Sequence, residues 1–308
     1  MGKITSIHDT FIRAIMADKT IAIEYFQNYL PPFVAGQLDF STLTQLPDVY
    51  VSAELQKTMS DIVYSCQRKD GRGEIKVSLL IEHKSYPDKY SPVQIGSYIF
   101  SGMQKQIEAK EKQLSPIIPV LLYHGKGRWQ YQTLSDLFKT LDPGWQKFIP
   151  DFDYVYNNLG EISDQQVEAL NNKFLVASLL ALKHTFEREW LEANVLRLLQ
   201  LSDNAPENLQ SSLIVYTFGR SGLKEEQIIA IIETLPITVK ATIMSTLDIF
   251  VEKGEKIGVE KGEKIGFDKA LQRNTRNMLF EGFSVNIICK VLEVTPEYVA
   301  RVQKELAK

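Results

Sequence analysis

The sequence is poor in several features that mark specialised classes of protein. Only two cysteines occur among its 308 residues, which excludes a disulfide framework and favours a reducing compartment. Lysine and arginine (35) do not outnumber aspartate and glutamate (38), and the formal net charge is −3. This balance argues against a wide basic surface for non-specific nucleic-acid binding, although it is compatible with a local basic cleft.

Long apolar runs are also scarce. The longest, such as residues 174–182, are too short to span a bilayer. Residues 1–5 lead directly to His8 and Asp9 without an apolar signal region. We therefore expect a cytoplasmic protein without a membrane partner.

The first half of the chain contains an alternation of helix and strand patterns. Apolar residues at helical spacing predict helices over residues 8–30 and 92–112. Strands are predicted within residues 48–64 and over residues 75–84, 117–123 and 149–157. Residues 69–73, K-D-G-R-G, have the composition of a hairpin loop. This order predicts an α/β fold over residues 5–160, with helices flanking a mixed sheet.

Helical periodicity dominates the rest of the chain. We expect a helical extension over residues 161–250 that packs on the first domain, and a helical tail over residues 268–308. Between them the eight-residue unit V-E-K-G-E-K-I-G occurs twice, over residues 251–266. Its glycines weaken a helix whereas its glutamates and lysines favour one. Residues 251–267 are therefore predicted to be a linker, either a marginal helix or a flexible charged segment.

The tail has a weak helix-turn-helix outline. Ser284 after Gly282, and Pro296 after Thr295, are start signals for two short helices. Charges of both signs largely cancel along these helices. DNA binding and self-association, or another protein contact, are therefore alternative roles for the tail.

Two carboxylates and a lysine lie in neighbouring strand patterns. Glu82 and Lys84 are two residues apart at the end of an apolar run, and Asp61 lies in the strand-like segment before it. Side chains two residues apart share one face of a strand. An ionised carboxylate entering a buried strand is costly unless a cation, a proton or a metal compensates it.

This arrangement suits metal-assisted hydrolysis of a phosphodiester. Asp61 and Glu82 are suitable ligands for Mg²⁺ (or Mn²⁺), and Lys84 could position the attacking water or offset developing charge. The alternative is a structural salt bridge between Lys84 and one of the two carboxylates.

Five short motifs follow one another in the order H-D-T-F (8–11), Y-L-P (29–31), S-D-I-V-Y (60–64), L-I-E-H-K-S (80–85) and V-L-L-Y-H-G (120–125). In this order they resemble the Rpn family of recombination-promoting nucleases, transposase-like proteins of the PD-(D/E)xK nuclease superfamily. The resemblance implies a restriction-endonuclease-like core, a divalent metal, and DNA as the substrate of an endonuclease linked to recombination or mobile elements. The motif positions that match are Asp61, Glu82 and Lys84, although members of the family often carry glutamine in place of the lysine. A non-catalytic DNA-binding or regulatory module on the same fold is the alternative function.

Three further residues are candidates for the same site. Asp9 could reach it from the first helix as an additional acidic metal ligand, as in some nucleases of the superfamily; the alternative is an N-cap of that helix. Gln94 and Tyr98 resemble the Q-x-x-x-Y element of related nucleases, and their spacing puts them on one helix face. They could hydrogen-bond the DNA backbone, unless Tyr98 is a core aromatic.

The loop after the predicted strand at 117–123 adds a basic pair. Lys126 and Arg128 lie between glycines and Trp129 and could contact DNA phosphates. The alternative is a turn anchored by a core Trp129. His124 is not a metal-ligand candidate, because no second histidine lies near it in the sequence.

Overall fold

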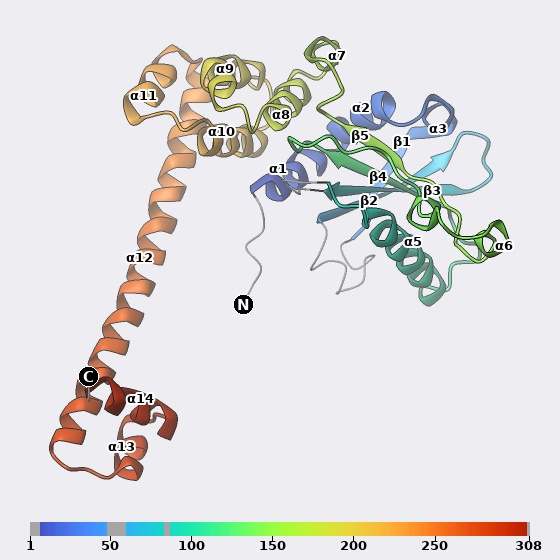
Figure 1. The fold of residues 1–308 in the computed structure, drawn as a ribbon. Coiled ribbons are helices and arrows are strands. Elements are labelled where there is room, and N and C mark those ends of the chain that lie inside the picture. Colours follow the sequence, from blue (N-terminus) through green and yellow to red (C-terminus); the bar gives the residue numbers. More distant parts are fainter. Residues whose placement is uncertain (1–6, 48–59, 83–86, 307–308) are drawn as a thin grey trace. The chain divides into compact units, whose positions relative to one another are not determined.

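The structure is a computed structural model, which describes residues 7–47, 60–82 and 87–306 (Figure 1). It divides into two compact units, Met1–Ile243 and Met244–Lys308. The first unit contains a sheet and most of the helices, and the second is helical. The limits predicted for the four segments of the chain stay predictions.

A five-stranded mixed sheet forms the centre of the first unit. Its strands lie in the order β1 (Leu38–Gln45), β2 (Ser60–Arg68), β3 (Glu74–Glu82), β4 (Ile117–Tyr123) and β5 (Val155–Asn158). The pairs β1–β2 and β2–β3 are antiparallel, whereas β3–β4 and β4–β5 are parallel. This sheet and its flanking helices confirm the predicted α/β class.

The hairpin between β2 and β3 is located where the sequence predicts it. Gly71 and Gly73 have φ values of 70° and 102°, in the left-handed region that glycine enters without a steric penalty. Residues 48–59, part of a predicted strand region, lie outside the described residues. The antiparallel partner of β2 on that side is β1, a strand that was not predicted.

Helices cover both faces of the sheet (Figure 1). The crossover helix α5 (Ser91–Glu108) joins β3 to the parallel strand β4. It packs on one face in a cluster formed by Val63, Ile95, Tyr98, Ile99, Leu121, Tyr123, Trp129 and Tyr154. The opposite face carries Ile62, Tyr64, Val120 and Leu122, which belong to the larger core.

Helices α1 (Ile7–Met16), α2 (Lys19–Tyr29) and α3 (Pro32–Gln37) precede the sheet, and α1 and α2 contact its β2 and β1 strands. The single helix predicted over residues 8–30 is therefore wrong. Asp18 interrupts it, because its carboxylate accepts hydrogen bonds from the backbone amides of Thr20 and Ile21 and caps a new helix.

The connection from β4 to β5 contains two short helical turns, η2 (Ser135–Phe138) and α6 (Pro143–Gln146). After β5 the first unit continues as helices α7 (Asp164–Glu168), α8 (Lys173–Lys183), α9 (Arg188–Leu201), α10 (Glu207–Ser221) and α11 (Glu225–Thr234). Helices α8 and α10 contact α1 and share the larger core with the sheet. The predicted packing of helices on the α/β part is confirmed.

The long helix α12 (Ile237–Phe280) contains the whole repeat at 251–266, so the repeat has a helical conformation. In the second unit it is followed by α13 (Val285–Leu292) and α14 (Pro296–Leu306). Ser284 and Pro296 stand at the predicted helix starts. Exposed apolar side chains occur at Phe283, Ile287 and Val291, and self-association through these helices stays a prediction.

Candidate functional site

The strand register brings two of the predicted catalytic positions together. Asp61 of β2 pairs with Leu80 of β3, and Glu82 follows Leu80 by two residues. Paired residues share a face, and every second residue of a strand returns to it. Positions 61 and 82 are therefore diagonal neighbours on one face. Val63, two residues after Asp61, packs against α5, so this face is the one that α5 covers.

This pair of positions lies near the carboxyl ends of the parallel strands. Glu82 is the last residue of β3 and pairs with Tyr123, the last residue of β4. The intervening helix α5 begins at Ser91, and a parallel crossover places its N-terminus at the same edge of the sheet. Such edges are where open α/β sheets bind ligands. Lys84, the third predicted catalytic residue, lies outside the described residues.

Two hard oxygen donors on neighbouring strands fit a Mg²⁺ ion, which prefers carboxylates and usually takes only one or two from the protein. Among the described side chains, no group of three or more histidine, cysteine, aspartate or glutamate residues is placed to hold a metal. The metal site predicted at positions 61 and 82 stays a prediction.

The first turn of α5 contains Gln94, which is half-buried. Its amide Nε2 lies 3.5 Å from an Oδ2 acceptor on Asp88, and the other carboxylate oxygen of Asp88 accepts a hydrogen bond from the backbone amide of Tyr90. Asp88 thereby contacts both the backbone at the start of α5 and the Gln94 side chain. One helical turn further on, Tyr98 is only 4% exposed and belongs to the cluster under α5, as expected for a core aromatic.

The loop after β4 is anchored by aromatic packing. Trp129 is buried, with its ring 4.9 Å from the Tyr123 ring in an edge-to-face arrangement, and its carbonyl accepts a hydrogen bond from Tyr156. Tyr123 donates to the carbonyl of Gly127 at 2.9 Å, and burial raises the pKa of this hydroxyl. The predicted turn around Trp129 is present. It leaves Lys126 and Arg128 exposed, so a role in binding phosphates is compatible with it.

Asp9 is half-buried in the first turn of α1, which already begins at Ile7. The alternative of an N-cap at Asp9 is therefore wrong, because an N-cap residue precedes its helix. Its role as a metal ligand stays a prediction.

The ring centroids of His8 and His124 are 4.9 Å apart, a contact that was not predicted from the sequence. Both histidines are buried. His8 lies in the first turn of α1 and His124 follows β4, so the contact joins the first helix to the sheet edge that carries Glu82. The available signal for this contact was that each histidine lies in one of the five sequence motifs, H-D-T-F (8–11) or V-L-L-Y-H-G (120–125).

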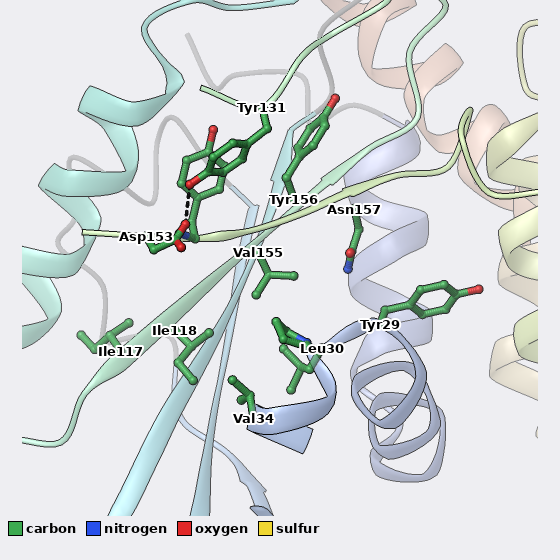
Figure 2. Close-up of a pocket in the computed structure, with 12 residues that line it drawn as sticks. Tyr29, Leu30, Val34, Ile117, Ile118, Tyr131, Asp153, Val155, Tyr156 and Asn157 are labelled. Carbon is green, nitrogen blue, oxygen red and sulfur yellow. Dashed lines mark hydrogen bonds between the residues drawn. The ribbon is translucent and has the colours of Figure 1, made fainter. Parts of the chain in front are cut away.

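A separate pocket of about 680 Å³ lies at the edge of β5, with α2 and α3 as its other wall. Tyr29, Tyr131, Tyr154 and Tyr156 contribute to its lining, and Asp153 accepts a hydrogen bond from the Tyr131 hydroxyl (Figure 2). The pocket includes Ile117, the first residue of β4. It is therefore distinct from the edge at Glu82 and Tyr123.

The protein that has this fold and these paired carboxylate positions has relatives among known nucleases. The model of the family described as "Putative transposase, YhgA-like" matches residues 6–210. The chain belongs to this family.

Its similarity to the Rpn proteins is modest and partial. It is 27% identical to "Recombination-promoting nuclease RpnA" of Escherichia coli (strain K12) over 118 residues, 38% of this chain and 40% of RpnA. It is 29% identical over 119 residues to "Recombination-promoting nuclease RpnD" of Escherichia coli O157:H7, 38% of this chain and 45% of RpnD. A third relative, "Inactive recombination-promoting nuclease-like protein RpnE" of Escherichia coli (strain K12), is 25% identical over 122 residues, 40% of each chain. These matches confirm the resemblance to the Rpn family.

The chain thus spans less than half the length of the curated relatives it matches. No solved structure matches it significantly. Within the described residues, no helix has the length and apolar character needed to cross a membrane.

Proposed function

We propose that the protein is a metal-dependent DNA endonuclease that hydrolyses phosphodiester bonds in DNA recombination or in the movement of mobile elements. The observation that carries the proposal is the β2–β3 register, which makes positions 61 and 82 diagonal neighbours on one face. Relatives named recombination-promoting nucleases support the same chemistry.

In this proposal Asp61 and Glu82 hold Mg²⁺ or Mn²⁺, with Asp9 of α1 as a further candidate ligand. A metal ion held by these residues would activate a water molecule and offset charge on the phosphate. Lys84 supplies a positive charge close to the reacting phosphate and positions the water by hydrogen bonding. The two carboxylates repel one another when no cation is present, so the pair is suited to binding a cation.

DNA would lie across the strand ends. In this proposal Gln94, whose amide lies 3.5 Å from Asp88 at the start of α5, donates a hydrogen bond to a phosphate. The exposed Lys126 and Arg128 follow β4 at the same edge and would add charge contacts. Tyr98 is buried beneath α5, so we assign it to the support of the helix rather than to a direct contact with DNA.

A second function is a non-catalytic DNA-binding or regulatory module on the same fold. It is favoured by the relative RpnE, whose name describes it as inactive. Such a protein would bind DNA and leave it intact.

The two functions are separated by incubating the purified full-length chain with supercoiled plasmid over a range of Mg²⁺ and Mn²⁺ concentrations, with EDTA as the control. The endonuclease proposal expects nicked or linear plasmid whose yield rises with metal and disappears in EDTA. Intact plasmid at all metal concentrations, together with a shift in plasmid mobility, would support the binding module instead.

A further inference from the structure

Two cations lie over one aromatic ring in the first unit. Phe186 lies in the connection between α8 and α9 and is half-buried. The Nζ atom of Lys126 is 5.8 Å from its ring centroid, and the Cζ atom of Arg220 is 5.6 Å from it. The three residues come from the loop after β4, the α8–α9 connection and the end of α10. We call this group the Phe186 platform.

The two cations of the platform have no acidic partner among the described side chains. Glu187 directly follows Phe186 in the sequence, but one of its carboxylate oxygens lies 3.1 Å from Nδ1 of His184. Neither Lys126 nor Arg220 is within 4.0 Å of a described carboxylate. Two cations that lie over an aromatic ring, and that have no partner among the described carboxylates, form a site for an anion that carries a flat group.

Arg220 is held in place by a buried chain of hydrogen bonds. Its Nε donates to Thr185 Oγ1 at 3.1 Å, and its Nη2 donates to the carbonyl of Thr185 at 3.3 Å. Thr185 Oγ1 also accepts from the Tyr216 hydroxyl at 2.9 Å, and the Tyr216 oxygen lies 2.7 Å from Nδ1 of His8. The chain fixes the guanidinium before any ligand binds, which lowers the entropic cost of binding.

The platform lies at the sheet edge that carries the candidate metal site. The rings of His124 and Phe186 are nearly parallel, with an interplanar angle of 11° and 6.1 Å between centroids. His124 directly follows Tyr123, the register partner of Glu82. Tyr123 packs under α5, whereas His124 contacts His8 of α1. The platform is therefore on the α1 side of the edge, and positions 61 and 82 are on the α5 side.

We propose that the Phe186 platform binds an unpaired nucleotide of a DNA strand. The base stacks on Phe186, and Lys126 and Arg220 bind the adjoining phosphates. This rests on the proposed function only in taking DNA as the ligand. A stacking ring is useful for a single strand, because the bases of a duplex are already stacked on one another. The site therefore selects single-stranded, gapped or frayed DNA over a continuous duplex.

The test is binding without cleavage. Fluorescence anisotropy of the full-length protein is measured in EDTA with a labelled single-stranded oligonucleotide and with the duplex of the same sequence, over a series of salt concentrations. The wild type should bind the single strand more tightly. Phe186→Ala should weaken single-strand binding by about tenfold, without changing the salt dependence and with little effect on the duplex.

The two cations should change a different quantity. Lys126→Gln and Arg220→Gln should each reduce the slope of log affinity against log salt by about 0.7, the value for one phosphate contact with a single strand. Arg220→Lys keeps the charge and should keep the slope. Phe186→Trp should keep single-strand affinity, since the indole also stacks on a base.

A matched control is available at Lys147 and Phe148, where Nζ lies 5.2 Å from the ring centroid and the ring is 70% exposed. Lys147→Gln and Phe148→Ala should leave both affinity and slope unchanged. Equal losses in the control variants would overturn the proposal, as would wild-type binding by Phe186→Ala.

Thermal melting monitored by circular dichroism identifies variants that have unfolded. If Phe186→Ala unfolds, Phe186→Leu replaces it and should show the same selective loss; equal losses for single strand and duplex with Phe186→Leu would overturn the site. Because EDTA removes the metal, the expected binding pattern in a protein that never cleaves DNA would support the site and reject only the endonuclease. Cleavage by a protein that shows no preference for single strands would support the endonuclease and reject the Phe186 platform.

Discussion

The Nδ1 atom of His8 lies 2.7 Å from the hydroxyl oxygen of Tyr216, and both side chains are buried. This contact ties the first turn of α1 to α10 across most of the chain. It also connects the residue beside Asp9 to the chain of hydrogen bonds that ends at Arg220.

Tyr216→Phe should lower the free energy of unfolding by about 1–3 kcal/mol, because it removes a buried hydroxyl that hydrogen-bonds with both His8 and Thr185. Chemical denaturation of the full-length protein measures the change. Tyr131→Phe is the control, since Tyr131 is 40% exposed and water can replace its hydrogen bond; its effect should be within about 0.5 kcal/mol. Equal effects of the two substitutions would contradict a structural role for the His8–Tyr216 contact.

Asp164 gives a prediction on acid stability. Burial raises the pKa of this carboxyl, but hydrogen bonds from Lys183 and His184 outweigh burial and lower the pKa below its usual value. A lowered folded-state pKa contributes stability above the unfolded-state pKa of about 3.9, and this contribution is lost as the pH falls through the folded-state value.

Asp164→Asn should therefore destabilise the protein at pH 7, and the difference from wild type should shrink below about pH 4. Urea denaturation at several pH values measures it. A difference that stays constant down to the lowest pH at which the wild type folds would show that the charge of Asp164 is not responsible.

The glycines of the eight-residue repeat test whether α12 is a helix in solution. A Cβ added at Gly262 or Gly266 meets no atom within 4 Å, so alanine can be introduced without a clash. In a helix each Gly→Ala change adds about 1 kcal/mol of local stability. Hydrogen exchange across residues 251–280 should slow in Gly262→Ala, Gly266→Ala and the double variant, with the largest effect in the double variant. Unchanged exchange would favour the flexible linker.

Lys84 is expected to tolerate glutamine better than glutamate. The Rpn family often uses glutamine at this position, and Lys84→Gln should retain measurable cleavage. If Lys84 belongs to the proposed metal site, Lys84→Glu adds a third negative charge to it, which repels phosphate, and should abolish cleavage. Initial rates on plasmid at saturating Mg²⁺ compare the two variants. A Lys84→Glu protein with the wild-type rate would remove Lys84 from the mechanism.

Local signals predicted the elements that define the sheet edge. The apolar run of β4, the crossover helix α5 and the glycines of the β2–β3 hairpin each carry their own pattern. The strand β1 lacks such a run: its sequence L-D-F-S-T-L-T-Q buries only three of its residues, and its place beside β2 is set by pairing. The break at Asp18 was missed because the apolar spacing continues on both sides of it, whereas a single cap decides the helix start.

The parts of the site that could not be predicted from the sequence depend on contacts between residues far apart in the chain. Asp61 and Glu82 could be linked because neighbouring strands share one hairpin, and the register agrees with that link. The contacts of His124 with His8, and of Phe186 with Arg220, depend on how α1, α8 and α10 pack on the sheet. No pattern in the sequence predicts that packing.

The most direct measurement concerns the cleavage rates of Asp61→Ala, Glu82→Ala and the double variant at saturating Mg²⁺, with Glu108→Gln as a control on the same α/β core. If both carboxylates hold one metal ion, each single variant should lose more than about a hundredfold in rate. The double variant should then be no worse than either single variant, because the residues act as a unit. Melting temperatures should be unchanged or higher, since removing one carboxylate relieves repulsion. Wild-type cleavage by both single variants, with the proteins folded, would contradict a shared metal site at Asp61 and Glu82.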